Sequence, residues 1–388
     1  MRAVICHKGE LTVQEVDAPE PGKGEVLLRV RRAGICGSDL HARSDGDETA
    51  DLAAEIGYPG FMRSEQSVIL GHEFVGEVVS YGPGCRKKWA PGTAVVSLPM
   101  RRHDGQPHLT GLDELAPGAF ADFVVVAEDM TMDVPHDLSL DEAALTEPLA
   151  VAYHAVRRGE VGRRDVATVI GCGPIGLAVI AMLKATGVRT VIASDLTAGR
   201  RELARRVGAD VVVDPGVESP FDITAEKGRY VSTVPQLFDA AFDGMRTLRR
   251  IPLVPWASVF HLADRLGATP TGPAIFECVG VPGMIEQVLT AAPLRSRIIV
   301  VGVCMQADRI RPAMAINKEL DLRFVFGYDP AEFHDTLQMI AKREVDVRPL
   351  ITATIGLDGV AEAFDVLGAA EQHAKILIDP ASEVSALS

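Results

Sequence analysis

The sequence has few aromatic residues, no paired cysteine spacing and no long apolar run. Aromatic residues make up 5% of the 388 positions, and the six cysteines are scattered rather than arranged as a disulfide framework. No apolar stretch approaches the length of a membrane span, and the N-terminus lacks the pattern of a signal peptide. We therefore expect a reduced, cytoplasmic protein that does not enter the membrane.

Positive charge is also scarce. The chain carries 39 lysines and arginines against 53 aspartates and glutamates, which gives a formal net charge of -14. An acidic surface repels nucleic-acid phosphates and anionic lipids, so neither is expected as a partner. Hydrophobic residues, in contrast, make up 47% of the chain. This amount of apolar material in 388 residues predicts two domains rather than one core.

The first part of the chain is typical of a compact β domain. Short apolar or alternating runs are separated by Pro- and Gly-rich segments such as EPGKGE and WAPGT. These runs cover residues 3–6, 26–31, 74–81, 94–98 and 120–126. From about residue 330 the chain returns to a helix and short strands, and we expect this tail to fold back onto the first domain.

From residue 166 onward, apolar strands alternate with helical segments. The pattern predicts strands over 166–170, 190–194, 211–213, 274–279 and 298–303, and helices over 175–186 and 200–207. Such alternation predicts a parallel sheet with helices on both faces.

The connection between the strands at 211–213 and 274–279 is longer than a crossover requires. Within it, a helix is predicted from residues at three-and-four spacing: Val234, Leu237, Phe238, Ala241, Phe242, Met245 and Leu248. A second helical run, Val259 to Leu266, stops at Gly267, a plausible C-terminal cap. The first apolar stripe requires burial against the sheet's own face, a neighbouring subunit or the cleft between the domains.

A glycine-rich turn follows the strand at 166–170. The pattern Gly171-x-Gly173-x-x-Gly176, which encloses Pro174 and Ile175, opens the next helix. Glycines let the backbone approach a pyrophosphate, and the helix N-terminus offers free N–H groups to it. This strand–turn–helix context predicts a dinucleotide site. Further cofactor contacts are expected from Val279, Gly280, Val301, Gly302 and Val303, at or just after the ends of two later strands.

Asp195 ends the strand after the glycine-rich turn. A carboxylate at this offset accepts hydrogen bonds from the ribose hydroxyls and repels a 2′-phosphate, which favours NAD over NADP. Arg200, a further candidate cofactor contact, and Arg201 lie close enough downstream to weaken that preference. A simple role for Asp195 as a helix cap is the alternative.

Four residues from distant segments offer a metal-binding set. Cys36 lies in AGICGSDLH, His72 and Glu73 in ILGHEFVGEV, and Glu147 in ALTEPLAVAYHA. Each has an ordinary structural explanation when taken singly. Together, a thiolate, an imidazole and carboxylates suit zinc, and three protein ligands leave a coordination position open for catalysis.

The segments AGICGSD, GHEFVGEV, EPLAVAYHA and GCGPIGL occur in the order found in the zinc-dependent medium-chain dehydrogenase/reductase family, and the chain resembles that family from end to end. The spacing of Cys36 and His72 is similar to that of the butanediol dehydrogenase branch. The resemblance implies an α/β fold with a GroES-like catalytic domain, residues 1–152 completed by 329–388. A doubly wound, NAD-binding Rossmann domain would follow at 153–328, with an inserted helical segment around 218–250.

The resemblance also implies roles for residues of the site. Cys36, His72 and Glu147 would hold a catalytic zinc, with Glu73 as an alternate or water-linked ligand. Ser38 would take the first step of a proton relay, with His41 further out. The implied reaction transfers a hydride between NAD and a secondary alcohol, diol or polyol to give a ketone, in a homodimer or homotetramer.

One departure from the family pattern concerns a second metal. Many members carry a lobe with four cysteines for a structural zinc, whereas residues 97–120 here contain none. His103 and His108 cannot replace four thiolates, so a single zinc is expected. Two other interpretations stay open: a zinc-free quinone or enoyl reductase of the same superfamily, and a catalytically silent NAD-binding protein.

Overall fold

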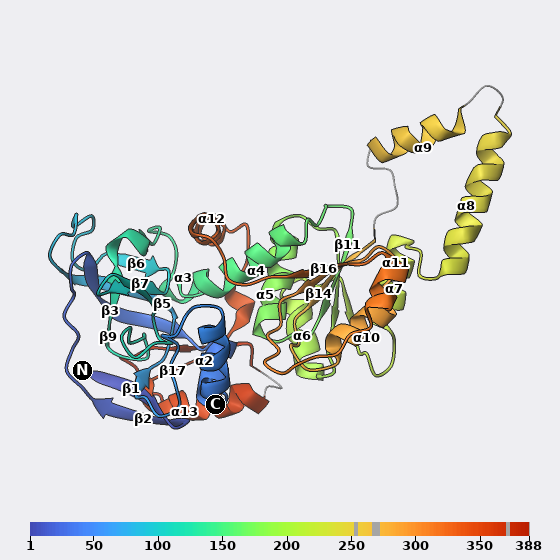
Figure 1. Cartoon of the computed structure of the whole chain (residues 1–388). Coiled ribbons are helices and arrows are strands. Elements are labelled where there is room, and N and C mark those ends of the chain that lie inside the picture. Colours follow the sequence, from blue (N-terminus) through green and yellow to red (C-terminus); the bar gives the residue numbers. More distant parts are fainter. Residues whose placement is uncertain (252–254, 266–271, 370–372, 388) are drawn as a thin grey trace.

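The computed structural model describes residues 1–251, 255–265, 272–369 and 373–387. Two bodies lie side by side: a β-rich domain that carries both termini, and an α/β domain built on a parallel sheet (Figure 1). The predicted fold class is confirmed. No helix among the described residues is long and apolar enough to cross a membrane.

The β-rich domain contains a seven-stranded sheet in the order β10-β6-β5-β3-β18-β17, with β9 also paired to β3. A smaller sheet has the order β2-β1-β4, and β7 and β8 form a hairpin. The strands before the tail are β1 (Arg2–His7), β2 (Glu10–Glu15), β3 (Glu25–Gly34), β4 (Val68–Ile69), β5 (Glu73–Tyr81), β6 (Ala94–Ser97), β7 (Met100–His103), β8 (Gln106–Leu109), β9 (Phe123–Ala127) and β10 (Thr131–Asp133). The helices are α1 (Gly37–Ser44), α2 (Gly46–Glu55) and α3 (Leu140–Ala143).

The C-terminal tail completes this first domain. It contains α12 (Pro330–Ala341), β17 (Ile351–Ile355), α13 (Val360–Ala369) and β18 (Lys375–Ile378). Strand β18 pairs antiparallel with β3, with Leu377 opposite Gly34. Ile376 and Phe364 belong to the same buried cluster as Phe120. The expected return of the tail to the first domain is confirmed, and this return brings the end of the chain to the middle of the sheet.

The α/β domain has six parallel strands in the order β13-β12-β11-β14-β15-β16. The strands are β11 (Val166–Ile170), β12 (Thr190–Ser194), β13 (Val211–Val213), β14 (Ala274–Glu277), β15 (Arg297–Val300) and β16 (Asp321–Phe324). The helices are α5 (Pro174–Ala185), α6 (Ala198–Arg206), α7 (Pro220–Gly228), α10 (Met284–Ala291) and α11 (Pro312–Lys318). The strand order changes direction between β11 and β14, where sheets of this kind bind dinucleotides.

The predicted strands at 166–170, 190–194 and 211–213 match β11, β12 and β13. Strands β14 and β15 end earlier than predicted, because Val279 and Val303 lie in the loops that follow them. The proposed boundary between residues 152 and 153 falls inside α4 (Thr146–Arg158), so one continuous helix links the two domains.

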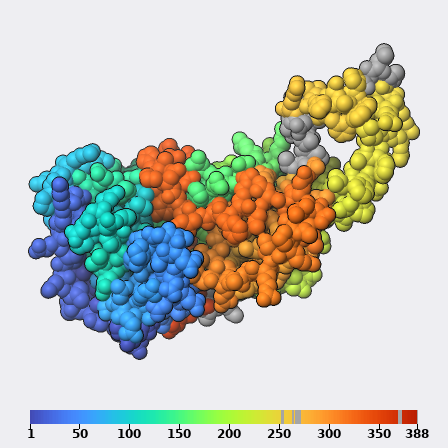
Figure 2. Space-filling view, viewed as in Figure 1, coloured from blue at the N-terminus to red at the C-terminus, as the bar shows by residue number. Residues whose placement is uncertain are grey.

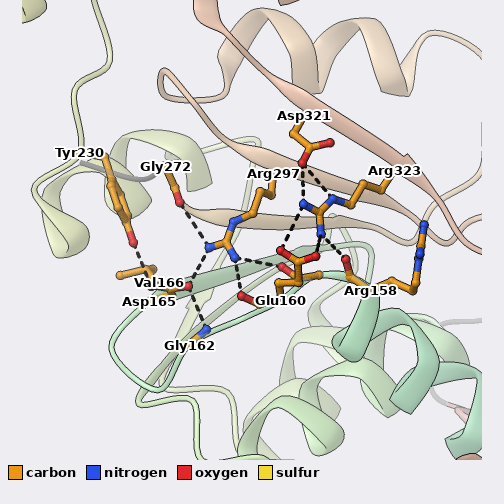
Figure 3. A network of polar contacts seen from close by, with 11 residues as sticks. Arg158, Glu160, Gly162, Asp165, Val166, Tyr230, Gly272, Arg297, Asp321 and Arg323 are labelled. Carbon is orange, nitrogen blue, oxygen red and sulfur yellow. Dashed lines mark hydrogen bonds and ion pairs between the residues drawn. The ribbon is translucent and has the colours of Figure 1, made fainter. Parts of the chain in front are cut away.

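Polar contacts tie the end of α4 to the amino edge of the parallel sheet (Figure 3). The Arg297 guanidinium pairs with Asp165 at 2.7 Å. The Arg323 guanidinium donates to the Arg158 carbonyl at 2.6 Å and pairs with Glu160 at 3.1 Å. This network lies at the opposite edge from the glycine-rich turn, so its role is to support the fold.

The long connection after β13 divides into two parts. Helix α7 packs on the sheet with Ile223 buried, and therefore belongs to the core. Helices α8 (Val234–Arg249) and α9 (Trp256–Arg265), which we call the arm, project from the body of the molecule (Figures 1 and 2). The helix predicted from the stripe is confirmed as α8. The possibility that the stripe packs on the sheet's own face is wrong, because α8 has no buried residue. The predicted cap at Gly267 lies outside the described residues.

Candidate functional site

Cys36 lies at the junction of β3 and α1, where it is the N-cap residue of the helix. The Asp39 carboxylate accepts a hydrogen bond from Cys36 N at 2.9 Å, which fixes this turn. The donor atoms of Cys36, His72 and Glu73 all lie within 4.8 Å of one another. The structure therefore brings three of the four predicted metal-site residues into one tight cluster.

His72 is buried immediately before β5. It follows Gly71, whose φ of +98° is a conformation that side chains other than glycine rarely adopt. His72 Nδ1 lies 3.2 Å from Asp39 Oδ1, whereas Nε2 lies 3.1 Å from Ser38 Oγ. Burial lowers the pKa of His72, but the combined effects of Asp39 and Cys36 outweigh it, so the pKa is raised well above its ordinary value. Asp39 is thus the charged neighbour of the ring, although Nδ1 is buried and forms no hydrogen bond with any residue that the structure describes.

Glu73 is fully buried on β5 and forms an ion pair with Lys375 of β18. Lys375 Nζ contacts both Glu73 carboxylate oxygens at 2.8 Å and donates to the Ile35 carbonyl at 2.9 Å. The carboxylate lies so close to Gly34 that a Cβ there would be 2.2 Å from Glu73 Oε2. Burial lowers the pKa of Lys375, but the combined effects of Glu73, Cys36 and Glu147 outweigh it and raise the pKa above its ordinary value, so the lysine stays charged.

Glu147 lies in the first turn of α4 and is 8% exposed. It lies outside the 4.8 Å cluster and makes no ion pair with any residue that the structure describes. Burial, followed by the repulsion of Glu73, raises the pKa of Glu147 to about 7 against the opposing effects of His72, Tyr328 and Lys375. Glu147 is therefore a buried carboxylate that lacks a dedicated positive partner.

The chemistry of these donors fits a zinc ion. Sulfur, imidazole nitrogen and carboxylate oxygen are the three kinds of ligand atom that zinc takes from proteins. Asp39, Glu73, Glu147 and an ionised Cys36 would bring more negative charge than Lys375 compensates. A divalent cation would remove this imbalance, which is costly inside a protein.

The two predicted relay residues lie on α1. Ser38 Oγ contacts His72, as described above, and is therefore at the metal site. His41 is half-exposed, with Nδ1 3.4 Å from Asp45 Oδ2. Within the described part of the chain no hydrogen bond joins Ser38 to His41. A relay between the two residues therefore needs a further group, such as a cofactor hydroxyl or water.

The glycine-rich turn has the shape that a pyrophosphate requires. Gly173 is the N-cap of α5, and a Cβ built on it would have no heavy atom within 4 Å, so this side of the turn is open. At Gly176, in contrast, a Cβ would lie 1.9 Å from the Gly171 carbonyl oxygen. Pro174 occupies the first helical position, next to Ile175. The open backbone N–H groups at this helix start fit a dinucleotide phosphate.

Asp195 follows β12 beside the turn and is buried. Its Oδ2 accepts a hydrogen bond from Cys172 N and its Oδ1 one from Thr197 N, both at 2.8 Å. Arg200 of α6 approaches to 3.9 Å, and its Nε is buried without a hydrogen-bond partner. Each carboxylate oxygen keeps a free lone pair, so Asp195 both shapes the turn and can accept a ribose hydroxyl.

The remaining predicted cofactor residues gather at the carboxyl ends of β14 and β15. A Cβ on Gly302 would lie 2.4 Å from Gly280 N, so the two loops touch through their glycines. Val301 is buried, whereas Val279 and Val303 are exposed. Sequence reasoning missed Glu277, whose Oε1 accepts hydrogen bonds from Val279 N at 2.6 Å and Gly280 N at 3.0 Å. Its only sequence signal was an acidic residue at the end of a buried strand.

Comparisons with known proteins agree with this geometry. The model of the alcohol dehydrogenase GroES-like domain matches residues 22–136, and that of the zinc-binding dehydrogenase matches residues 174–245. The chain is 29% identical to (R,R)-butanediol dehydrogenase of Bacillus subtilis (strain 168), over 98% of this chain and 100% of that protein. It is 28% identical to sorbitol dehydrogenase of Homo sapiens, over 93% and 91% of the two chains.

Solved structures show the same relationship. The crystal structure of 2R,3R-butanediol dehydrogenase from Bacillus subtilis matches with a TM-score of 0.74 at 28% identity, over 98% of this chain and 99% of that one. A zinc-binding dehydrogenase from Sinorhizobium meliloti 1021, solved with NADP bound, matches with a TM-score of 0.73 at 26% identity, over the same shares of the two chains. The two domain models and the relatives that span the whole chain identify it as an oxidoreductase of the alcohol dehydrogenase type, similar throughout to the zinc-dependent medium-chain dehydrogenase/reductase family.

Proposed function

We propose that the protein oxidises a small diol or polyol to the hydroxyketone, with NAD as the hydride acceptor and one catalytic zinc. The observation that carries the proposal is the buried cluster of Cys36, His72 and Glu73, with the uncompensated Glu147 beside it. The substrate class rests on the two relatives named for butanediol and sorbitol, which match the chain over more than nine-tenths of its length.

Cys36, His72 and Glu147 are the proposed zinc ligands, with Glu73 as an alternate ligand. Lys375 already holds both Glu73 oxygens, whereas Glu147 lacks such a partner. When bound, zinc polarises an alcohol oxygen and lowers the pKa of its hydroxyl. Ser38 Oγ, beside His72, is placed to accept the proton that the alcohol loses. His41, on the exposed side of α1, is the proposed outer end of this relay.

A second, structural zinc is not part of the proposal. The β7–β8 hairpin and the loop after it carry His103 and His108 but no cysteine. His108 Nδ1 is hydrogen-bonded to Asp113 at 2.7 Å, and Asp113 also accepts from the Tyr58 hydroxyl at 2.7 Å. His108 thus has a structural function in this hairpin.

NAD is the proposed cofactor because Asp195 places a negative charge beside the turn that would hold the adenosine ribose. Arg200 would instead favour NADP, since its guanidinium lies where it could contact a 2′-phosphate. We give Asp195 the larger weight, because it is fixed by two backbone hydrogen bonds whereas Arg200 approaches only to 3.9 Å.

One experiment tests the reaction, the cofactor and the metal together. The purified protein is assayed for zinc content and for NADH or NADPH formation with a panel of secondary alcohols, diols and polyols. We expect one zinc per chain, oxidation of diols or polyols, and a higher kcat/KM with NAD than with NADP. Quinone or enoyl reduction without zinc would overturn the proposal in favour of a zinc-free reductase. No turnover with any substrate would favour a silent NAD-binding protein, and a preference for NADP would refute the assignment of Asp195.

We further propose that the chain forms a homodimer or homotetramer in which the arm packs on a second copy. Large apolar side chains of the arm lie exposed on both helices: Phe238, Phe242, Trp256, Phe260 and Leu262. An exposed apolar stripe of this kind marks an interaction surface. Residues 234–265 carry four arginines and three aspartates, a net charge of +1 in a chain whose net charge is -14. The slightly positive arm and the acidic body of a second copy therefore carry opposite net charges.

Replacing Phe238 and Phe242 together with glutamate tests this proposal. The double variant should sediment as a smaller assembly than the wild type, because the new charges cannot be buried at an apolar contact. Val217→Glu is the matched control, since Val217 is 86% exposed and lies outside the arm. An unchanged assembly size would contradict the proposal, and a raised KM for the cofactor at that size would indicate a lid instead.

A further inference from the structure

Glu277 is the last residue of β14, at the carboxyl edge of the parallel sheet, and it is only 1% exposed. Its Oε1 accepts hydrogen bonds from two successive backbone N–H groups of the loop that follows, Val279 N at 2.6 Å and Gly280 N at 3.0 Å. Successive N–H groups that point at one oxygen form a nest, an arrangement that binds anions. Here the nest is filled by a carboxyl group of the chain itself, which fixes the shape of the loop.

The backbone of the same residue fixes a second loop. The Glu277 carbonyl oxygen accepts hydrogen bonds from Val301 N at 2.8 Å and Gly302 N at 2.9 Å, in the loop after β15. Four N–H groups from two loops are therefore bound by one buried residue. Its side chain holds the loop after β14, and its backbone holds the loop after β15.

The two loops also contact each other and the glycine-rich turn. A Cβ on Gly280 would lie 2.6 Å from the Val303 carbonyl oxygen, and a Cβ on Gly302 would lie 2.4 Å from Gly280 N. A Cβ on Gly171 would lie 2.8 Å from Val279 Cγ2, so the loop after β14 packs directly on the turn. The turn and the loops thus form one continuous surface beside the point where the strand order changes direction.

This surface carries exposed apolar side chains. Val279 is 38% exposed and Val303 is 54% exposed, although both lie next to buried strand ends. Binding sites for cofactors are lined mainly by apolar groups that the cofactor covers. The position of the two valines depends on the backbone of their loops, and hence on Glu277.

We propose that Glu277 is a positioning residue for the dinucleotide, which holds the loops after β14 and β15 in the shape that binds it. The inference deepens the proposed function and rests on it, because it assumes that NAD lies at this edge of the sheet. Without the carboxyl group, Val279 N and Gly280 N would turn to water, and the loop would have to be ordered again whenever the cofactor binds. That ordering cost weakens binding.

The dissociation constant of NADH, measured by fluorescence titration of the purified protein, tests the inference without turnover. Glu277→Leu should raise this constant by about tenfold or more, because two buried N–H groups lose their acceptor. Glu277→Gln should recover most of the affinity, since its amide oxygen can accept both hydrogen bonds. Zinc content should stay the same in both variants. Equal losses of affinity in the two variants would overturn the inference, because the acceptor would then not be the cause.

Glu128 provides a matched control in the first domain. It is 8% exposed and likewise accepts hydrogen bonds from two successive backbone N–H groups, Arg86 N at 2.7 Å and Lys87 N at 2.8 Å. Glu128→Leu should lower the melting temperature as Glu277→Leu does, yet leave the dissociation constant of NADH unchanged. A matching loss of NADH affinity in the Glu128 variant would assign the effect to lost stability and refute the positioning role.

Glu277→Asp serves where the leucine variant does not fold. It keeps the carboxyl group but shortens the side chain by one methylene, so its affinity for NADH should fall between those of the wild type and Glu277→Leu. Unchanged NADH binding in the aspartate and leucine variants contradicts the inference and leaves the proposed function standing. A wild-type protein that binds neither NADH nor NADPH would instead refute the proposed function itself.

Discussion

A Cys36→Ala variant is expected to lose nearly all bound zinc and nearly all turnover while keeping its fold. The thiolate is the only sulfur ligand that the described cluster offers, and the other donors cannot replace it. The fold should survive, because the capping contact of this turn is made by the backbone N–H of residue 36 with Asp39. The measurements are zinc content by atomic absorption, NADH formation and far-ultraviolet circular dichroism.

Cys85→Ala is the control for this variant. Cys85 is also partly buried, but its thiol donates to the Glu25 carbonyl, away from the cluster. Its replacement should leave zinc content and turnover unchanged. Normal turnover in the Cys36 variant would remove Cys36 from the metal site, and two zincs per wild-type chain would reveal a second site.

Ser38→Ala should lower kcat by ~10²–10⁴-fold, the range that a general acid–base group contributes. The Ser38 hydroxyl lies beside His72, where the proton of the bound alcohol must leave. Because the hydroxyl does not touch the glycine-rich turn, the affinity for NAD should stay the same. The measurement is the pH dependence of kcat together with the dissociation constant of NAD.

Ser44→Ala provides the comparison on the same helix, since Ser44 is exposed and its hydroxyl contacts only Asp45 and the Leu40 carbonyl. This variant should behave like the wild type. Unchanged kcat and an unchanged pH profile in Ser38→Ala would exclude the serine from proton transfer.

The parallel sheet was predictable because its central strands are buried on both faces and appear as continuous apolar runs. Val166–Ile170 and Thr190–Ser194 therefore match the structure residue for residue. The edge strand β16, Asp321–Phe324, was missed, because the charged residues Asp321 and Arg323 interrupt its apolar pattern.

The candidate ligands of the metal site could be predicted from the sequence, whereas the residues that support them could not. Cys36 and His72 lie in recognisable segments, whereas Lys375 lies in a short apolar run that indicates only a strand. Its partner Glu73 is 302 positions away, and no local spacing reveals a pair at that separation. Asp39 was open to prediction, since it follows Cys36 at the interval of a capping box.

The arm shows a different limit of sequence patterns. The three-and-four spacing of its apolar residues identified α8 correctly, because the spacing determines which residues share a helix face. The same spacing does not say what covers that face. Of the three partners considered for it, the sheet's own face does not cover it, and α7 packs on this part of the sheet instead.

The pairing of Glu73 with Lys375 has a consequence for the order of events during synthesis. Domains of most proteins fold from the N-terminus as the ribosome extends the chain. Here the α/β sheet, from Val166 to Phe324, is contiguous and can form while the tail is still inside the ribosome. The first domain cannot complete its sheet before β18 is synthesised, since Glu73 pairs with Lys375 of β18 and β3 pairs with β18. The segment translated first is thus the last to mature.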